Sequence, residues 1–168
     1  MDKLKRLEKL KDFFDAIGGE IDGRKKIHKI IYLCQKKGIV FGQDFIFHYY
    51  GVFSPGLSSD LQQAEQWGII EEKQIEHSWG ISYSLKLKEA DQNENYQEDI
   101  LKHKDFITRI AKEKASVLEV LSTIVYLFHE GYSNEDIESK LADLKGHLDN
   151  FFPVAKKLAK ELYDIGEA

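Results

Sequence analysis

Apolar residues recur at helical spacing through the first part of the chain. The first set is separated by three or four positions and consists of Leu4, Leu7, Leu10, Phe14 and Ile17. This spacing predicts a helix over about residues 3 to 17, ending at Gly18. The second set follows the i, i+3, i+4, i+7 pattern and consists of Ile27, Ile30, Ile31 and Cys34. It predicts a second helix, with Asp22 as its N-cap and Gly38 at its end.

The pattern changes from helical to alternating in the segment FIFHYY, residues 45 to 50. Alternation of this kind predicts a short strand, and the apolar character of both sets of positions predicts that both of its faces are covered. The aromatic residues of this region are Phe45, Phe47, Tyr49, Tyr50 and Phe53. They are interpreted mainly as core, with a pocket lining as the alternative, because aromatic side chains on a strand beside two helices more often pack inside.

A third helix and a hairpin follow the aromatic segment. Ser54 as N-cap and Pro55 at the first helical position predict a helix over about residues 55 to 67. The apolar alternation of residues 69 to 75 and 81 to 87, joined through a polar turn near Gly80, predicts a β-hairpin.

The remainder of the chain reads as helical after a polar connection. Residues 88 to 97 have no apolar periodicity and predict a loop. Beyond it we expect only helices, among which residues 117 to 128 are apolar nearly all round and predict a central, buried helix. Ser133 predicts the start of the next helix, and a last helix is expected from about Pro153, with Val154, Leu158, Leu162 and Ile165 facing inward.

These elements predict a mainly α fold with a small β-hairpin or sheet, of the α+β class. We expect one domain over residues 1–168, with a winged-helix-like mixed half (1–88), a connecting loop (88–97) and a helical half (98–168). Three helices followed by a hairpin are the skeleton of a winged helix, in which the third helix reads DNA. The predicted third helix carries Asp60 and Glu65 but no Lys or Arg, which argues against contact with phosphates.

Charge is distributed unevenly. The chain carries −5 overall, but the segment from residue 24 to residue 37 holds six basic and no acidic residues, so the remainder carries −11. An acidic protein repels polyanions over most of its surface, so any contact with nucleic acid is expected near this basic segment. The single cysteine and the lack of a long apolar run predict a cytoplasmic protein outside the membrane.

The segment from Gly23 to Glu72 carries a family resemblance. Its Gly-Arg-Lys-Lys helix, aromatic strand with Tyr-Gly and Ser-led helix resemble the YwgA-type proteins of Gram-positive bacteria. They are more distantly similar to the Panacea domain of SocA-like antitoxins. Val52 stands where that pattern has the Pro of Tyr-Gly-Pro. The resemblance implies a winged-helix-like core with added helices. SocA-like antitoxins bind a toxin and can present it to a protease.

Two polar surfaces are candidate partner-binding sites. The first is one face of the second predicted helix, formed by Lys25, Lys29, Tyr32 and Lys36 with Arg24 and His28 alongside. It could accept phosphate or an acidic partner protein, or be only a solvated face. The second is the outer side of the third predicted helix, with the hydrogen-bonding residues Ser58, Ser59, Gln62, Gln63 and Gln66.

Catalytic motifs are weak in this sequence. Residues 18 to 25 resemble a P-loop but lack its Lys and Ser/Thr, and His28 and Cys34 cannot meet on one helix. We expect no catalytic residues, metal site or cofactor. The leading hypothesis is a non-enzymatic, antitoxin-like or adaptor-like regulator that binds a partner protein, either a toxin or a regulator. The alternatives are a DNA-binding winged-helix transcriptional regulator and, third, an enzyme. The pattern leaves oligomeric state open.

Overall fold

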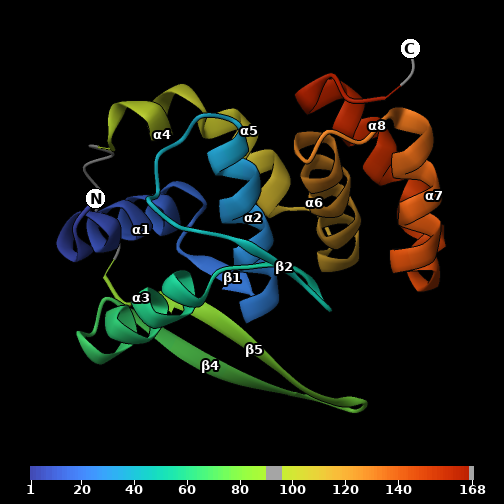
Figure 1. Cartoon of the computed structure of the whole chain (residues 1–168). Coiled ribbons are helices and arrows are strands. Elements are labelled where there is room, and N and C mark those ends of the chain that lie inside the picture. The colour runs from blue at the N-terminus through green and yellow to red at the C-terminus, as the bar shows by residue number, and fades with distance from the viewer. Residues whose placement is uncertain (90–95, 167–168) are drawn as a thin grey trace.

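The structure is a computed structural model that describes residues 1–89 and 96–166 (Figure 1). Its N-terminal half contains three helices, α1 (Lys3–Ala16), α2 (Arg24–Lys36) and α3 (Pro55–Gln66). Each begins and ends within a residue or two of its predicted bounds. Asp2 caps α1 and Ser54 caps α3, but α2 has Gly23 at its N-cap position without a side-chain cap. The predicted capping role of Asp22 is therefore wrong, because Asp22 belongs to a strand.

A three-stranded antiparallel sheet packs beside these helices. It consists of β1 (Glu20–Asp22), β4 (Ile70–His77) and β5 (Gly80–Leu87), in the order β1-β5-β4. The predicted hairpin is confirmed, since Ile70 pairs with Leu87 and His77 pairs with Gly80. The sequence did not reveal β1, whose three residues are too few for an alternating pattern. With β1 between α1 and α2, the order of elements is compatible with a winged helix.

The aromatic segment forms a second, smaller sheet instead of one strand. β2 (Ile46–His48) turns at Tyr49 and Tyr50 and pairs with β3 (Gly51–Phe53). Gly51 has a φ of 98°, a backbone conformation that residues with a Cβ rarely adopt. The prediction of a strand covered on both faces is wrong, because Ile46 and His48 are exposed and Tyr49 is 87% exposed.

The C-terminal half is helical, as predicted. Its elements are α4 (Glu98–Lys102), α5 (Lys104–Ala111), α6 (Ala115–His129), α7 (Asn134–Lys145), the 3-10 helix η1 (Gly146–Phe151) and α8 (Phe152–Tyr163). Residues 90–95, most of the predicted connecting loop, lie outside the described residues. The predicted burial of α6 is confirmed, and it contacts α2, α7 and α8. Val154 is 46% exposed, so its predicted inward position is wrong, whereas Leu158 and Ile165 are buried.

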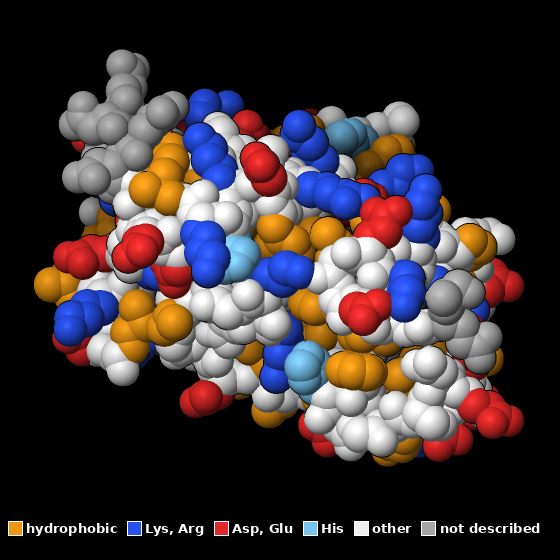
Figure 2. All heavy atoms as spheres, turned by 90° about the horizontal axis from the view of Figure 1, so that it is seen from above, with side chains coloured by type: hydrophobic (Ala, Val, Ile, Leu, Met, Phe, Trp, Pro, Cys, Tyr) orange, Lys and Arg blue, Asp and Glu red, His pale blue; other side chains and the backbone are white. Residues whose placement is uncertain are grey.

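The elements assemble around one core in an α+β arrangement (Figure 1). α6 lies against α2, with α7 and α8 on its other side, and the β4–β5 hairpin projects beyond the helices. Figure 2 shows one face of the molecule, on which basic and acidic side chains are interspersed. Within the described residues, no helix combines the length and apolarity needed to cross a bilayer.

Candidate binding cleft

Two adjoining cavities lie where α2 meets α3 and the two hairpins. The first, which we call the glutamate cavity, has a volume of about 310 Å³ and is lined by residues that include Gln62, Glu65 and Glu72. The second, the lysine cavity, has a volume of about 190 Å³. Its own lining residues are Lys25, Lys29, His48, Tyr50, Val52 and Phe53. Arg24, His28 and Ser58 line both, so the cavities form one cleft.

His28 is fixed between α2 and the start of α3. Its Nδ1 accepts a hydrogen bond from the backbone N–H of Ser54 at 3.1 Å, and its Nε2 lies 3.2 Å from Ser58 Oγ. Because Nδ1 is an acceptor, the neutral ring carries its proton on Nε2, which donates to Ser58. Burial lowers the pKa of His28 to about 4, with a smaller contribution from the charge of Lys29. His28 is therefore a neutral hydrogen-bonding wall of the cleft at neutral pH.

Lys29 lines the lysine cavity although the residue is only 4% exposed. None of the described residues forms a hydrogen bond or ion pair with its Nζ. Burial lowers the pKa of Lys29 to about 8, and the charges of Lys145 and Lys25 act in the same direction. The carboxylate of Glu119 opposes this effect without forming an ion pair. Lys29 is thus a buried cation whose charge the surrounding protein compensates only in part.

Aromatic rings form the other walls of the lysine cavity. Phe53 stacks on His28 with ring centroids 4.5 Å apart, and His48 stacks on Phe53 at 5.4 Å. Lys25 Nζ lies 3.8 Å from the centre of the Tyr50 ring, which is a cation–π contact. The pocket interpretation of the aromatic segment, which the sequence ranked below a core role, therefore applies to Tyr50 and Phe53.

The glutamate cavity has compensated charges. Arg24 Nε donates to Glu72 Oε2 at 2.8 Å, and Arg24 Nη2 forms an ion pair with the same carboxylate. This pair raises the pKa of Arg24. The guanidinium also lies 5.1 Å from the centre of the Tyr83 ring. Arg24 is held by the β4–β5 hairpin and is less available to a ligand than Lys29.

The predicted basic face of α2 is not one exposed surface. Lys29 and Tyr32 are buried because β3 and α6 pack against α2, which the spacing of residues along one helix cannot reveal. Tyr32 packs edge-on against Phe45, and its hydroxyl has no hydrogen-bond partner among the described residues. Lys36 is exposed one turn further on, above the Tyr32 ring. Only Arg24, Lys25, His28 and Lys29 of this set reach the cleft.

The Ser/Gln face of α3 is divided in the same way. Ser58 and Gln62 line the cleft, whereas Ser59 and Gln66 are exposed outside it. Gln63 accepts a hydrogen bond from Lys3 Nζ at 2.9 Å and contacts Gln66. Of the eleven predicted partner-binding residues, the cleft therefore brings together Arg24, Lys25, His28, Lys29, Ser58 and Gln62.

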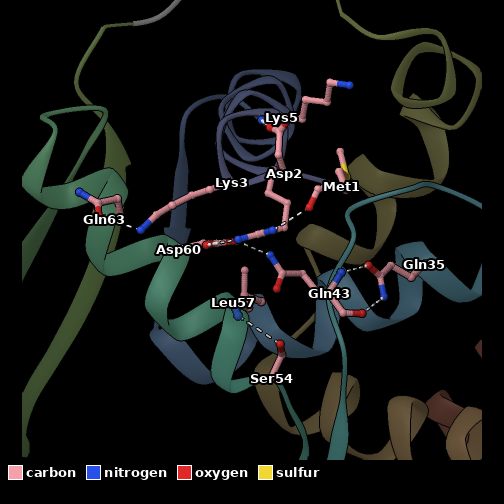
Figure 3. A network of polar contacts seen from close by, with 11 residues as sticks. Met1, Asp2, Lys3, Lys5, Gln35, Gln43, Ser54, Leu57, Asp60 and Gln63 are labelled. Atoms are coloured by element: carbon pink, nitrogen blue, oxygen red, sulfur yellow. Dashed lines mark hydrogen bonds and ion pairs between the residues drawn. The ribbon is translucent and has the colours of Figure 1, made fainter.

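Asp60 belongs to a polar network on the opposite side of α3 (Figure 3). It is 2% exposed and accepts hydrogen bonds from Arg6 Nε at 2.8 Å and Gln43 Nε2 at 2.7 Å. Gln43 in turn exchanges two hydrogen bonds of 2.9 Å with the side chain of Gln35. Asp60 does not present the negative charge to DNA that its position on the predicted third helix suggested, because it is buried and paired with Arg6.

Several cleft residues were missed by sequence reasoning. His48 and Val52 reach the lysine cavity only because the chain reverses after His48, and Glu72 reaches Arg24 only because the β4–β5 hairpin folds back over α2. Val52, the departure from Tyr-Gly-Pro, is 1% exposed and pairs with Phe47. The Tyr-Gly dipeptide was the available signal for the reversal, since Gly51 needs a positive φ.

A larger cavity, of about 510 Å³, lies between α6, α7 and α8. Its charged lining includes Glu138 and Lys156, which form an ion pair with each other at 2.6 Å. Across residues 1–89 and 96–166, no group of three or more His, Cys, Asp or Glu side chains is arranged to hold a metal ion. The charge of Lys29, which the protein compensates only in part, makes the lysine cavity the stronger candidate for a binding site.

Comparison with known proteins yields one informative relative. The chain is 28% identical over 138 residues to the uncharacterized protein YwgA of Bacillus subtilis, a match that covers 81% of each protein. This similarity supports the resemblance to YwgA-type proteins of bacteria. No protein-family model matches the chain. No solved structure matches it significantly.

Proposed function

We propose that the protein is a non-enzymatic regulatory module of the cytoplasm that binds an acidic segment of a partner protein in the cleft. The observation that carries the proposal is Lys29, a residue only 4% exposed that lines the cavity and whose ammonium group has no hydrogen bond or ion pair to any described residue. A buried cation without a counter-ion destabilises a fold. The presence of such a cation beside an open cavity is explained if an anion binds in the cavity and pairs with the cation. Lys25 adds a second cation at the same cavity.

Exposed apolar side chains on the β4–β5 hairpin support a protein partner. On the β4–β5 hairpin, Trp79 is 75% exposed, Ile81 50% and Tyr83 40%. Aromatic side chains of this kind are enriched in protein interfaces, where large rings contribute most of the binding energy. The motif resemblance of residues 23 to 72 to SocA-like antitoxins, read from the sequence, motivates an antitoxin-like or adaptor-like role, in which the partner is a toxin or a regulator.

The alternative is a DNA-binding regulator. The order of elements, with β1-β5-β4 beside three helices, favours it. The surfaces that would face DNA oppose it, because Glu65 is exposed on α3 and Glu72 neutralises Arg24. We therefore rank the protein partner first.

The test is affinity capture from a lysate of the native cells, with and without nuclease. We expect a partner protein that is retained after nuclease treatment and lost in Lys25→Glu. Lys5→Glu is the matched control, because it reverses one charge on the exposed surface of α1, away from the cleft. Partners recovered only while nucleic acid is intact would favour the DNA-binding alternative. Equal capture by wild type and Lys25→Glu would exclude the cleft as the binding surface.

A further inference from the structure

The lysine cavity combines one buried cation with apolar walls. Lys29 lines it as the buried cation, and Val52, Phe53 and Tyr50 are among its other lining residues. At neutral pH, His28 is uncharged and already engaged with Ser54 and Ser58. The lining has three cations: Lys25, held over the Tyr50 ring, Arg24, paired with Glu72, and Lys29. Lys29 is the buried one of the three.

This arrangement selects among anions. A phosphate dianion is usually bound by several N–H donors, such as an Arg fork or a row of backbone amides, and its three oxygens would be poorly satisfied here. A carboxylate carries one charge, and it can accept a hydrogen bond from Lys29 while the group behind it packs on the rings. The cavity volume of about 190 Å³ limits that group to the size of one compact side chain.

We propose that the lysine cavity binds a carboxylate carried on a single compact apolar group, such as an aromatic ring. The inference rests on the proposed function, because it specifies the group that a partner inserts into the cleft: the C-terminal residue of a chain, with its free carboxylate and an apolar side chain. A free aromatic acid has the same chemistry and is the second source.

Calorimetric titration with four probes tests the inference and separates the sources. The probes are the peptide Ala-Ala-Phe, the same peptide with an amidated C-terminus, 3-phenylpropanoate and inorganic phosphate. We expect the free carboxylates to bind at least about tenfold more tightly than the amide, because a charged hydrogen bond is lost in the amide. Tighter binding of Ala-Ala-Phe than of 3-phenylpropanoate identifies a chain terminus, and the reverse order identifies a free acid.

Lys29→Met is the decisive variant. It keeps the length and the apolar stem of the side chain and removes only the charge, so we expect it to fold and to lose carboxylate binding at least about tenfold. Lys36→Met is the matched control on the same helix, since Lys36 lies outside the cavity. Wild-type affinity should fall as the pH rises through about 8, where free Lys29 loses its proton. Lys29→Met should show no such dependence.

Three results would overturn the inference: equal affinity for the peptide and its amide, preference for inorganic phosphate, or unchanged binding in Lys29→Met. Its failure is distinguishable from that of the proposed function. If no probe binds but Lys25→Glu still abolishes capture of a partner, the cleft binds protein by other contacts and only the inference fails. If the carboxylates bind but displace no captured partner, the inference stands and the partner-binding function fails.

Discussion

Asp60 on α3 and Lys29 on α2 are both buried charged residues, but only Asp60 is paired with an opposite charge. Asp60 is enclosed by Arg6 and Gln43, whose donors lie within 2.8 Å of its carboxylate (Figure 3). Lys29 has no hydrogen bond or ion pair to any described residue, and it borders a cavity. A charge that is fully paired fixes the fold, whereas a charge that is left unpaired at a cavity destabilises the free protein and is available to a ligand.

The largest expected effect comes from removing the carboxylate of Asp60 from its buried network. Asp60→Ala leaves the guanidinium of Arg6 and the amide of Gln43 without their shared acceptor. We expect a loss of about 3 kcal/mol in the free energy of unfolding, because removing one partner of a buried pair strands the other. Urea denaturation measures it, with the exposed Asp44→Ala as control. A loss below about 0.5 kcal/mol, the range of ordinary surface changes, would show that the network contributes little.

Acid should lower the stability of the folded protein through His28. Its pKa is about 4 in the folded protein and near its usual 6.5 in the unfolded chain. Between these values the unfolded chain takes up a proton that folded His28 excludes, so stability falls as the pH drops from 6.5 to 4, by about 3 kcal/mol. Above pH 6.5 the ring is neutral in both states and contributes no pH dependence.

Two measurements check the titration of His28. An NMR titration should give an imidazole pKa near 4. His28→Asn should be less stable than wild type at pH 7, yet its stability should depend less on pH between 6.5 and 4.5. An NMR pKa of 6 or above would contradict the burial of a neutral ring.

The architecture around these two regions was largely predictable, but the pairing of their charges was not. Local signals such as the Ile stripe of α2 and the Ser54-Pro55 start of α3 place both elements within one or two residues of their observed bounds. Whether a charge on these helices is exposed depends on what packs against them. Arg6 meets Asp60 across 54 positions, and the spacing within α3 gives no sign of it.

Only part of the cleft was predictable, because the sequence does not show what packs against each helix. Arg24, Lys25 and Lys29 were recognised as a basic group because they are close in sequence. The other walls of the cleft include His48, Phe53 and Glu72, which reach the cleft through chain reversals. A helical face predicts which side chains point together, but only tertiary packing decides which of them is covered.

A third prediction has the opposite sign to that of Asp60→Ala. Lys29→Met removes a buried charge that the protein compensates only in part and leaves an apolar side chain of similar length. We expect the free energy of unfolding to rise by about 1 kcal/mol at pH 7. Folded Lys29 loses its proton near pH 8 and the unfolded chain near 10.5, so wild-type stability should rise with pH across that window and the difference should shrink. A clear loss of stability at pH 7 would mean that Lys29 has a structural partner.

The smallest expected effect is at Ser54, which lies between the Asp60 network and the lysine cavity. Its hydroxyl accepts a hydrogen bond from Leu57 N–H and caps α3, while its backbone N–H donates to His28. Ser54→Ala removes the cap but keeps the backbone donor, so we expect a loss of about 1 kcal/mol with carboxylate binding preserved. Ser133→Ala at the cap of α7 is the matched control. Loss of binding in Ser54→Ala alone would show that the cap also orients the cleft.

The exposed aromatic residues of the β4–β5 region have a consequence for spectroscopy. The chain has two tryptophans, Trp67 at the end of α3 and Trp79 at the hairpin turn, and they are 56% and 75% exposed. Their indoles are already largely hydrated in the folded state, so intrinsic tryptophan emission should change little when the core unfolds. The same emission should shift to shorter wavelength when a partner covers the hairpin, which gives a label-free optical signal of complex formation with a low background from folding.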